Sequence, residues 1–395
     1  MHIYSTDSFS SNSPHSSPSE LNSFFSSSFK EMSSPSSFKK LRVALVGARG
    51  YSGMELGRCL LRHPALSSLT LILNETAIDV KTWIPEAQYY SHCLSSLTTK
   101  QFMASLENFD IVFLATPAEG SLSLVPQVIS TSLKIIDLSG AFRLNNSEDY
   151  KKWYGFEHHH PKLLKQAHYG LVPFHTHKDP KNISLIANPG CYATAVQMAL
   201  IPLLKSSLLN LETIVIDAKS GTTGAGKKAS EVQLFAEVEG DCQAYRIGKH
   251  QHFPEIIQYL TQFSKISTEI ETLDPIFSTT LLPIRRGIVA SIYARLNTNV
   301  TPHDLEKAYA TEYETYPLVR VSSAQQPEAS YLLSLRSVVG SARTHITYSV
   351  EGTKLQIYSN IDNLMKGAAS QAIENMNYLY QWPLHTGLTH LEGLI

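Results

Sequence analysis

One cysteine stands at a position suited to nucleophilic chemistry. Residues 188–192 read NPGCY, a tight turn, and apolar residues then recur at helical spacing from Ala193 to Leu204. This pattern predicts that Cys191 lies in the first turn of a mostly buried helix, where unpaired N–H groups and the positive end of the helix dipole favour a thiolate. We therefore take Cys191 as the candidate nucleophile, with a buried structural cysteine as the alternative.

Two histidines further along the chain are suited to moving protons. Residues 248–255 read GKHQHFPE and lead into a predicted helix that runs through Leu260, with Pro254 at or near its first position. Histidines two residues apart just before a helix are well placed to project into a cleft. We expect one of His250 and His252 to be catalytic and the other to be structural.

Near residue 50 the chain carries a candidate nucleotide loop. A predicted strand at 41–46 is followed by GARGYSG at 47–53 and by a predicted helix at 54–62. This order places backbone N–H groups and a helix N-terminus where a pyrophosphate can bind. Because the spacing is GxxGxxG rather than GxGxxG, a glycine-permitted turn of an ordinary βαβ unit is the alternative. The candidate cofactor-binding residues of the loop are Gly47, Arg49, Gly50, Tyr51, Ser52 and Gly53.

The remaining elements predict the fold. Short apolar strands alternate with helices in the first part of the chain, which is typical of a parallel, doubly wound sheet. Later strands alternate apolar and polar residues, as an antiparallel or mixed sheet does. We therefore predict an α/β protein with a Rossmann-type parallel sheet domain and an α+β catalytic domain with a mixed or antiparallel sheet. The first strands are predicted at 69–73, 109–115 and 134–137, and the later ones at 213–218, 280–283, 287–295 and 345–350. The predicted dinucleotide-binding domain spans 41–187 and 360–395, and the catalytic domain spans 188–359.

Two other motif-like segments are interpreted as having no chemistry of their own. Residues 219–228 read KSGTTGAGKK and nearly spell a phosphate-binding loop, but Lys228 stands where a hydroxyl residue would hold magnesium. We interpret this segment as a flexible substrate wall rather than as part of an ATPase. The histidines at 158–160 and 168 have no cysteine or acid at zinc-ligand spacing, so no metal site is predicted.

Composition narrows the partners and the compartment. The net charge is −1 with acids and bases interspersed, so neither nucleic acid nor an anionic membrane is an expected partner. The 4 cysteines are far apart, which fits a reducing compartment, and no apolar run approaches the ~20 residues that span a bilayer. Residues 1–40 are rich in serine and poor in acids, and we expect a disordered tail. The protein is thus expected in the cytoplasm, or in a plastid if this arginine-free tail is a transit peptide.

The candidate groups together fit one type of chemistry, which is thiol-dependent acyl reduction. Cys191 would attack an acyl carbon, a cofactor hydride would reduce the resulting thioester, and a histidine would transfer protons. A non-catalytic dinucleotide-sensing protein is a rival, because it would keep the glycine loop. It would have no use for Cys191 together with His250, so their joint presence favours an enzyme.

The motifs as a set resemble one enzyme family. They are GARGYSG at 47–53, DLSGAFRL at 137–144, WYG at 153–155, ANPGCY at 187–192, DAKSG at 217–221, HQHFPE at 250–255 and DNLMKG at 362–367. This set, in this order, is similar to that of the N-acetyl-gamma-glutamyl-phosphate reductases. The resemblance implies an arginine-biosynthesis enzyme that uses NADPH to convert N-acetyl-γ-glutamyl phosphate to N-acetylglutamate semialdehyde and phosphate. It also implies the fold of aspartate-semialdehyde dehydrogenases. A reductase of the same fold for an aspartyl or aminoadipyl phosphate is the nearest alternative, because it would differ only in the substrate pocket.

The resemblance also implies roles for individual residues. Cys191 would be the nucleophile, and His250, with Glu255 behind it, would be its acid/base partner. Arg143, Lys219 and His252 would contact the substrate or its phosphate, and Asn363 and Lys366 would contact the cofactor. The acyl phosphate would be the small-molecule partner, and we expect a homo-oligomer.

Three positions depart from the family's usual residues. Arg49 stands where serine or threonine is usual, Ala118 where histidine or asparagine is common, and Gln251 where arginine is usual. The second predicted strand ends at Asn74 and Glu75, and a carboxylate there suits the ribose diol of NADH. Because Arg49 projects from the loop next to that ribose and its guanidinium can bind a phosphate, we predict NADPH as the cofactor.

Overall fold

The computed structural model describes residues 38–74, 79–175, 179–228, 230–264 and 273–389. Residues 40–395 form one compact unit. The tail predicted at residues 1–40 lies almost wholly outside the described residues, and so does Glu75.

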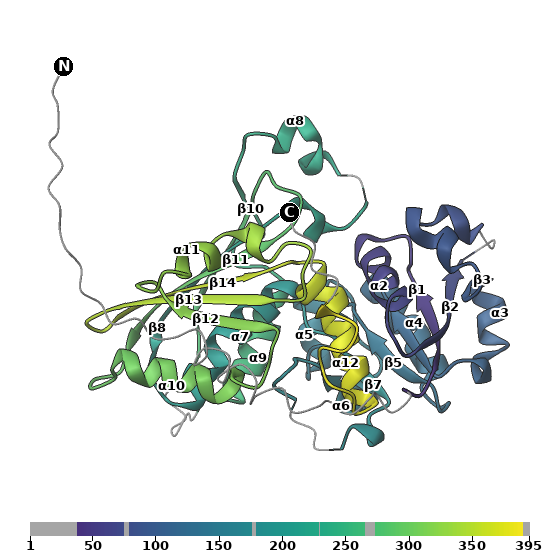
Figure 1. The fold of residues 1–395 in the computed structure, drawn as a ribbon, viewed down its shortest axis with the longest axis horizontal. Helices are drawn as coiled ribbons and strands as arrows, with labels where there is room; N and C mark the ends of the chain where they lie inside the picture. Colours follow the sequence, from purple (N-terminus) through teal and green to yellow (C-terminus); the bar gives the residue numbers. More distant parts are fainter. Residues whose placement is uncertain (1–37, 75–78, 176–178, 229, 265–272, 390–395) are drawn as a thin grey trace, which may run out of the picture. The chain divides into compact units, whose positions relative to one another are not determined.

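The first part of this unit is built on a parallel sheet, sheet A, with strand order β3-β2-β1-β4-β5-β7-β6 (Figure 1). The central strands β1 and β4 are almost continuously apolar and buried, as strands covered on both faces are. The predicted parallel, doubly wound sheet is therefore confirmed. Its strands are β1 (Leu41–Val46), β2 (Leu66–Leu73), β3 (Leu94–Thr98), β4 (Ile111–Leu114), β5 (Lys134–Asp137), β6 (His168–Tyr169) and β7 (Leu185–Ala187).

Helices connect the strands of sheet A. The helix α2 (Tyr51–Leu61) follows the glycine loop after β1, and α4 (Ala118–Val128) follows β4. Both loops lie at the carboxyl ends of parallel strands, where such sheets bind ligands. The other helices of this part are α3 (Thr99–Met103), α5 (Ser147–Trp153) and α6 (Pro161–Gln166), with single 3-10 turns η1 (Val80–Thr82), η2 (Pro85–Tyr90), η3 (Leu106–Asn108) and η4 (Pro180–Asn182).

The helix α7 (Cys191–Lys205) begins shortly after β7 and lies at the centre of the core. Gly190 is its N-cap residue, and every side chain from Tyr192 to Leu204 is buried. An apolar surface on all sides of a helix is typical of a core helix. α7 packs against α9 (His252–Thr261) and α10 (Pro302–Tyr313) and against strands of the second sheet. The predicted position of Cys191 in the first turn of a buried helix is thus confirmed.

The second sheet, sheet B, has the order β12-β13-β14-β11-β8-β10-β9. Its pairs β12/β13 and β8/β10 are parallel, and the others are antiparallel, so the predicted mixed sheet is confirmed. Its strands are β8 (Leu209–Ser220), β9 (Gln243–Ala244), β10 (Ile276–Leu281), β11 (Ile288–Leu296), β12 (Val319–Ser323), β13 (Thr344–Glu351) and β14 (Lys354–Ile361). A short helix α11 (Ala329–Leu332) and the turn η7 (Leu335–Ser337) join β12 to β13.

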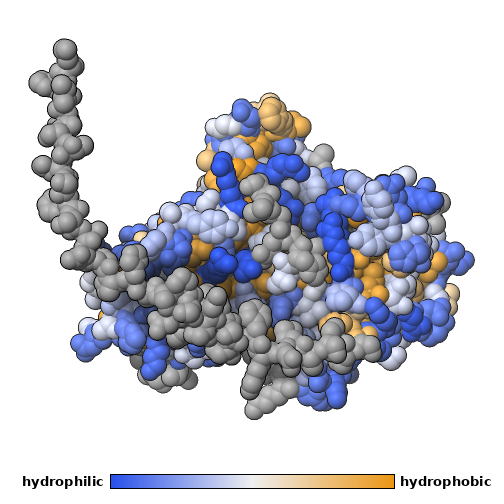
Figure 2. Space-filling view, viewed as in Figure 1, coloured by the Kyte–Doolittle hydropathy of each residue, from blue (hydrophilic) through white to orange (hydrophobic). Residues whose placement is uncertain are grey.

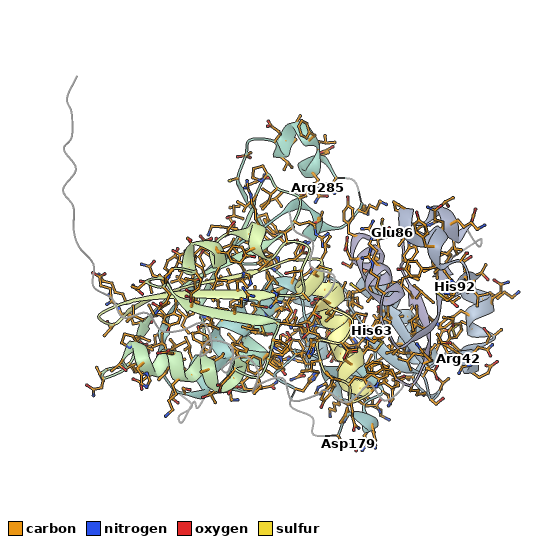
Figure 3. All side chains as sticks on the ribbon, viewed as in Figure 1. Arg42, His63, Glu86, His92, Asp179 and Arg285 are labelled. Atoms are coloured by element: carbon orange, nitrogen blue, oxygen red, sulfur yellow. The ribbon has the colours of Figure 1, made fainter. Side chains whose placement is uncertain are left out.

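The described part of residues 221–247, which we call the flap, leaves sheet B after β8 and returns to its edge at β9. The flap contains η5 (Thr222–Ala225), η6 (Glu231–Gln233) and α8 (Phe235–Val238), and Figure 1 shows α8 at its outer end. A hydrogen bond joins its base to the turn before β11, because the Thr223 hydroxyl donates to the Arg285 carbonyl oxygen (2.6 Å). Arg285 is labelled below α8 in Figure 3. Figure 2 shows apolar side chains at the tip, where Phe235 is 81% exposed. The flap is therefore anchored at its base and presents an apolar tip to solvent.

The C-terminal segment returns from sheet B to sheet A. After β14 the chain passes through a π-helical turn, η8 (Met365–Ala369), into α12 (Ser370–Leu379), and both elements pack against α2. His63, just after α2, lies with its Nε2 atom 3.0 Å from Asn377 Oδ1 of α12, and Figure 3 shows His63 beside that helix. Within the described residues, every helix is too short or too polar to cross a membrane.

A buried ion pair fixes this segment. Lys366 and Glu374 are both fully buried, with Nζ and Oε1 2.9 Å apart. Lys366 Nζ also donates to the Val172 carbonyl oxygen (3.2 Å) and to the Tyr316 hydroxyl (2.8 Å), and that hydroxyl donates to Glu374. Burial lowers the pKa of Lys366 and raises the pKa of Glu374, so each charge depends on the other.

We expect Lys366→Met to lower the free energy of unfolding by about 3 to 5 kcal/mol, because it leaves the Glu374 carboxylate buried without its counter-charge. Urea denaturation measures this change. The control is Lys366→Met combined with Glu374→Leu, which removes both charges and should recover much of the loss. A single variant as stable as wild type would contradict the role given to this pair.

Candidate active site

Cys191 lies where two cavities meet. One, of about 480 Å³, runs from the glycine loop to Cys191, and we call it the nucleotide cleft. The other, of about 420 Å³, lies beneath the flap, and we call it the flap cavity. Cys191, Gln251 and His252 line both. The sulfur therefore faces two compartments, as a group that acts between a cofactor and a substrate must.

The glycine loop has the form of a phosphate-binding turn. Gly47 has φ +83°, and a Cβ there would lie 2.3 Å from the Ala115 carbonyl oxygen; a Cβ at Gly53 would lie 2.3 Å from the Gly47 oxygen. Gly50, the N-cap residue of α2, has no side-chain cap and lines the cleft. The first N–H groups of α2 are thus free of a side-chain cap at the cleft, so these residues fit a pyrophosphate.

The predicted cofactor-binding residues divide into three groups. Gly50, Tyr51, Ser52 and Asn363 line the nucleotide cleft, whereas Gly47 and Gly53 shape the loop behind it. Asn363 also holds the flap, because its Nδ2 donates to the Thr223 hydroxyl (3.0 Å) and its Oδ1 accepts the Gly287 N–H (2.8 Å). The Arg49 side chain is exposed beside the loop and does not line the cleft in this structure.

Lys366 does not reach the cleft, so its predicted contact with the cofactor is wrong. Its ammonium group is fully buried in the pair with Glu374 described above. The neighbouring Gly367 does bear on the site, because a Cβ there would lie 2.7 Å from the Cys191 Cβ. This part of the DNLMKG motif therefore positions Cys191 by close packing.

Burial favours the protonated form of the Cys191 thiol. Burial raises its pKa to about 11, although the charge of Arg143 and the backbone N–H groups of Cys191 and Tyr192 act in the opposite direction. The expectation of a thiolate at the helix start is therefore wrong for this structure, because desolvation outweighs the helix N-terminus. Attack by this sulfur needs a base.

Both histidines of the HQH motif are neutral and so have a ring nitrogen that can accept a proton, although the burial that lowers their pKa values also weakens them as bases. Burial, followed by the charge of Arg246, lowers the pKa of His250 to about 3, and burial lowers the pKa of His252 well below its usual range. His252 packs directly on the Cys191 turn, because a Cβ at Gly190 would lie 2.4 Å from its Nε2 atom. His250 lines the flap cavity only, and its Nδ1 accepts the His252 backbone N–H (3.1 Å). The geometry therefore favours His252 as the proton acceptor.

Glu255 does not stand behind His250, and that prediction is wrong. Its buried Oε1 atom accepts the Gly190 N–H (2.7 Å) and the Tyr169 hydroxyl (2.7 Å), and its Oε2 lies 3.6 Å from Arg143 Nη1. It makes no hydrogen bond to His250 in the described structure. Because α9 begins at His252, Glu255 points back toward the Cys191 turn, one helical turn away from the histidines.

Arg143 links these groups. Its Nε donates to the Asn188 carbonyl oxygen (2.8 Å) and its Nη2 to the Leu138 carbonyl oxygen (2.7 Å), and its Nη1 lies 3.4 Å from His252 Nε2. It lines the nucleotide cleft while remaining 6% exposed. The structure thus brings Arg143 and His252 to the Cys191 turn, and the substrate contacts that the family resemblance implies for them stay a prediction.

Lys219 lies on the wrong face of sheet B to contact a substrate near Cys191. Ser220 lines the flap cavity, and successive side chains of a strand point to opposite faces. Lys219 accordingly pairs with the Asp217 carboxylate and lies 3.4 Å from the Ser291 hydroxyl on the outer face. Its predicted role is therefore wrong, because alternation along β8 places Lys219 on the face opposite Ser220.

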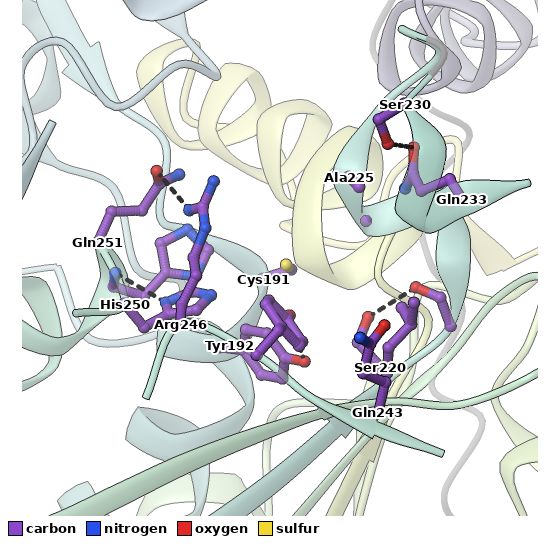
Figure 4. A pocket seen from close by; sticks show the side chains of 15 residues that line it. Cys191, Tyr192, Ser220, Ala225, Ser230, Gln233, Gln243, Arg246, His250 and Gln251 are labelled. Carbon is purple, nitrogen blue, oxygen red and sulfur yellow. Dashed lines mark hydrogen bonds between the residues drawn. The ribbon is translucent and has the colours of Figure 1, made fainter. Parts of the chain in front are cut away.

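Several lining residues of the flap cavity were not predicted. Figure 4 shows Arg246 and Gln251 on one side of Cys191 and Ser220, Ser230, Gln233 and Gln243 on the other. The Arg246 Nη1 donates to Gln251 Oε1 (2.9 Å). One feature of the sequence could have indicated this lining. Arg246 is a cation four residues before the first histidine, in a segment whose residues show no hydrophobic periodicity. The described part of the chain contains no cluster of three or more His, Cys, Asp or Glu side chains that could hold a metal ion.

Comparisons with known proteins agree with this architecture. The family model described as "Semialdehyde dehydrogenase, NAD binding domain" matches residues 42–180, and "Semialdehyde dehydrogenase, dimerisation domain" matches residues 191–363. Among solved structures, aspartate semialdehyde dehydrogenase II of Vibrio cholerae, complexed with ASA, superposes with a TM-score of 0.63 and 14% identity over 87% of this chain and 98% of that one. The enzyme of Francisella tularensis gives a TM-score of 0.60 at 14% identity over 85% and 99%. These structures establish the shared fold.

The curated relatives are closer in sequence. The N-acetyl-gamma-glutamyl-phosphate reductase of Halothermothrix orenii is 38% identical over 88% of this chain and 98% of its own length. That of Idiomarina loihiensis is 39% identical over 89% and 97%, and that of Geobacillus kaustophilus is 37% identical over 89% and 99%. With this identity over nearly the whole length of its relatives, the chain belongs to the N-acetyl-gamma-glutamyl-phosphate reductase family.

Proposed function

We propose that this protein reduces N-acetyl-γ-glutamyl phosphate to N-acetylglutamate semialdehyde and phosphate, a step of arginine biosynthesis. The observation that carries the proposal is the position of Cys191 between the nucleotide cleft and the flap cavity, with the neutral His252 beside it. A dinucleotide sensor would not require a half-buried thiol and a base at this junction.

The charges of the flap cavity favour this substrate over an aspartyl phosphate. Among its described lining residues, Arg246 carries the only permanent charge and no carboxylate is present. The free α-ammonium group of an aspartyl phosphate would find no anionic partner there, and an unpaired desolvated charge is costly. An acetylated amine is neutral and can bond to the serine and glutamine side chains of the same cavity.

The first half of the proposed mechanism forms a thioester. The Cys191 thiol gives its proton to His252, and the sulfur attacks the acyl carbon. A C–S bond forms and the C–O bond to phosphate breaks, and the imidazolium gives its proton to the departing phosphate oxygen. The positive charge of Arg143 and the N–H groups at the start of α7 stabilise the oxyanion of the tetrahedral intermediate.

The second half releases the aldehyde. A bound nicotinamide dinucleotide would supply the hydride that reduces the thioester, held at the cleft by the glycine loop. The carbonyl then re-forms as the C–S bond breaks, and Cys191 keeps the electron pair as thiolate. His252 relays a proton from solvent to the sulfur, which returns the site to its resting state.

NADPH is the proposed cofactor. The exposed Arg49 stands one residue before Gly50, the N-cap of α2, and its side chain is free to turn toward an adenosine 2′-phosphate. A guanidinium group binds a phosphate through two N–H groups, which supplies the cation that NADPH requires.

We further propose that a second copy covers the outer face of sheet B in a homo-oligomer. Asp217 and Lys219 lie on this face beside Ser291 and Tyr293, which is 39% exposed. The family model for residues 191–363 is described as a dimerisation domain, which supports oligomer contacts through this part of the chain. The described cysteines are free thiols, in keeping with a reducing compartment such as the cytoplasm or a plastid.

The function is tested in the reverse direction, with N-acetylglutamate semialdehyde, inorganic phosphate and NADP⁺. We expect phosphate-dependent formation of NADPH by the wild type and its loss in Cys191→Ala, with cofactor binding retained, because the thioester cannot form. Cys242→Ala is the matched control, since Cys242 is exposed outside both cavities. Variant activity within about tenfold of wild type would exclude the covalent mechanism.

We expect His252→Asn to lower kcat by about a hundredfold or more, the usual scale of proton-transfer catalysis. His250→Asn should have the smaller effect on kcat, because an asparagine oxygen can still accept the His252 N–H. The measurement is the kcat of both variants across a pH series. A larger loss in His250→Asn would return the proton-transfer role to His250.

For the cofactor, we expect Arg49→Ser to lower kcat/KM for NADPH by at least about tenfold while kcat/KM for NADH stays unchanged, since only NADPH carries the 2′-phosphate. The control is Arg62→Ser. Arg62 lies at the other end of α2, and its side chain is 40% exposed. A wild type that prefers NADH, or an equal effect on both cofactors, would refute this role of Arg49.

A further inference from the structure

We propose that Arg246 binds the α-carboxylate of the substrate and that Gln251 holds the Arg246 guanidinium in place. This inference rests on the proposed function, because it names the group that recognises one end of that substrate. Arg246 would set specificity without taking part in bond making or breaking.

The first support is the charge of the flap cavity. Its lining mixes hydroxyl, amide and imidazole groups with a single permanent cation, Arg246, among the described residues. An acyl chain with a carboxylate needs a counter-charge when it leaves water, since a desolvated carboxylate without one is strongly disfavoured. Arg246 is the group of the cavity that can provide it.

The other cations near Cys191 are placed for the opposite end of the substrate. Arg143 lines the nucleotide cleft, and its guanidinium is held by two backbone carbonyl oxygens and lies near Glu255. Lys227 also lines the nucleotide cleft. A substrate with a phosphate at one end and a carboxylate at the other can therefore lie across Cys191, with its phosphate toward Arg143 and its carboxylate toward Arg246.

The second support is the backbone of Arg246. Its φ of +48° lies in the left-handed region, which side chains other than glycine, asparagine and aspartate rarely adopt. The conformation is stabilised by a turn in which the Lys249 N–H donates to the Arg246 carbonyl oxygen (2.9 Å). Residues held in this region of φ and ψ cluster at active sites and ligand-binding sites.

The third support is the state of the guanidinium group. Nη1 donates to Gln251 Oε1 (2.9 Å), and in the described structure the other N–H groups make no hydrogen bond to protein. Figure 4 shows this pair beside His250 and Cys191. One edge of the guanidinium is thus held by Gln251, while the rest can accept a carboxylate through paired N–H groups.

The test compares two aldehydes that differ only in the α-carboxylate. N-acetylglutamate semialdehyde carries it, and 4-acetamidobutanal lacks it. In the reverse reaction with phosphate and NADP⁺, we expect Arg246→Met to lower kcat/KM for the first aldehyde by at least about thirtyfold and to leave kcat/KM for the second within about twofold. Arg246→Lys should restore part of the loss, because it keeps the charge without the planar fork.

Gln251→Ala should cause a smaller loss that is again confined to the carboxylated aldehyde, as expected of a positioning residue. Lys249→Met is the matched control, since this exposed cation of the same turn lies outside the cavity lining. An equal loss for both aldehydes in Arg246→Met would overturn the assignment. The assignment would also be overturned if Arg246→Met raised the KM for phosphate and kept the preference for the carboxylated aldehyde, because Arg246 would then bind the phosphate.

Binding separates this inference from the proposed function. Calorimetry with N-acetyl-L-glutamate and with 4-acetamidobutyrate, which lacks the α-carboxylate, needs no turnover. We expect the wild type to prefer N-acetyl-L-glutamate and Arg246→Met to lose that preference at an unchanged melting temperature. A wild type that turns over neither aldehyde would contradict the proposed function. If Arg246→Met still preferred N-acetyl-L-glutamate, the role given to Arg246 would be contradicted.

Discussion

The hydrogen bond from the Gly190 N–H to Glu255 Oε1 (2.7 Å) is the constraint on which the site depends. It joins the turn that follows sheet A to the first turn of α9. The Glu255 carboxylate is fully buried and lies 3.6 Å from Arg143, which is itself held by the carbonyl oxygens of Leu138 and Asn188. A buried carboxylate with a nearby cation and two strong donors keeps one orientation, and it thereby fixes the nucleophile relative to the histidines.

Close backbone packing completes this constraint. The His252 ring occupies the space that a Cβ of Gly190 would need, and Cys191 occupies the space that a Cβ of Gly367 would need. Three segments far apart in the sequence therefore meet without side chains between them. The glycines of the NPGCY and DNLMKG motifs follow from this geometry, because any larger residue would push the sulfur or the imidazole out of place.

The sequence predicts the two sheets, the helix α7 and the glycine loop of the nucleotide cleft, because these follow from local periodicity and from the turn chemistry around glycine. It does not predict the partners of long side chains. Lys219 differs from its predicted role although period-two alternation with Ser220 indicates its face. Glu255 bonds to Gly190, and Lys366 bonds to Val172 and Tyr316, in remote segments that local sequence patterns do not reveal. The high pKa of Cys191 was missed for a related reason. A helix start is visible in the sequence, but the burial that outweighs it is a property of the folded chain.

The raised pKa of Cys191 has consequences for the reactivity of its sulfur. A thiol whose pKa is raised to about 11 is a poor target for oxidants, since the thiolate is the reactive form. In the proposed mechanism the proton passes to His252 as the sulfur attacks, so the charge on sulfur is generated next to the electrophile. Arg143 then becomes more effective, because a bound substrate excludes water and lowers the local dielectric. Burial therefore favours the thiol form of Cys191 in the absence of substrate.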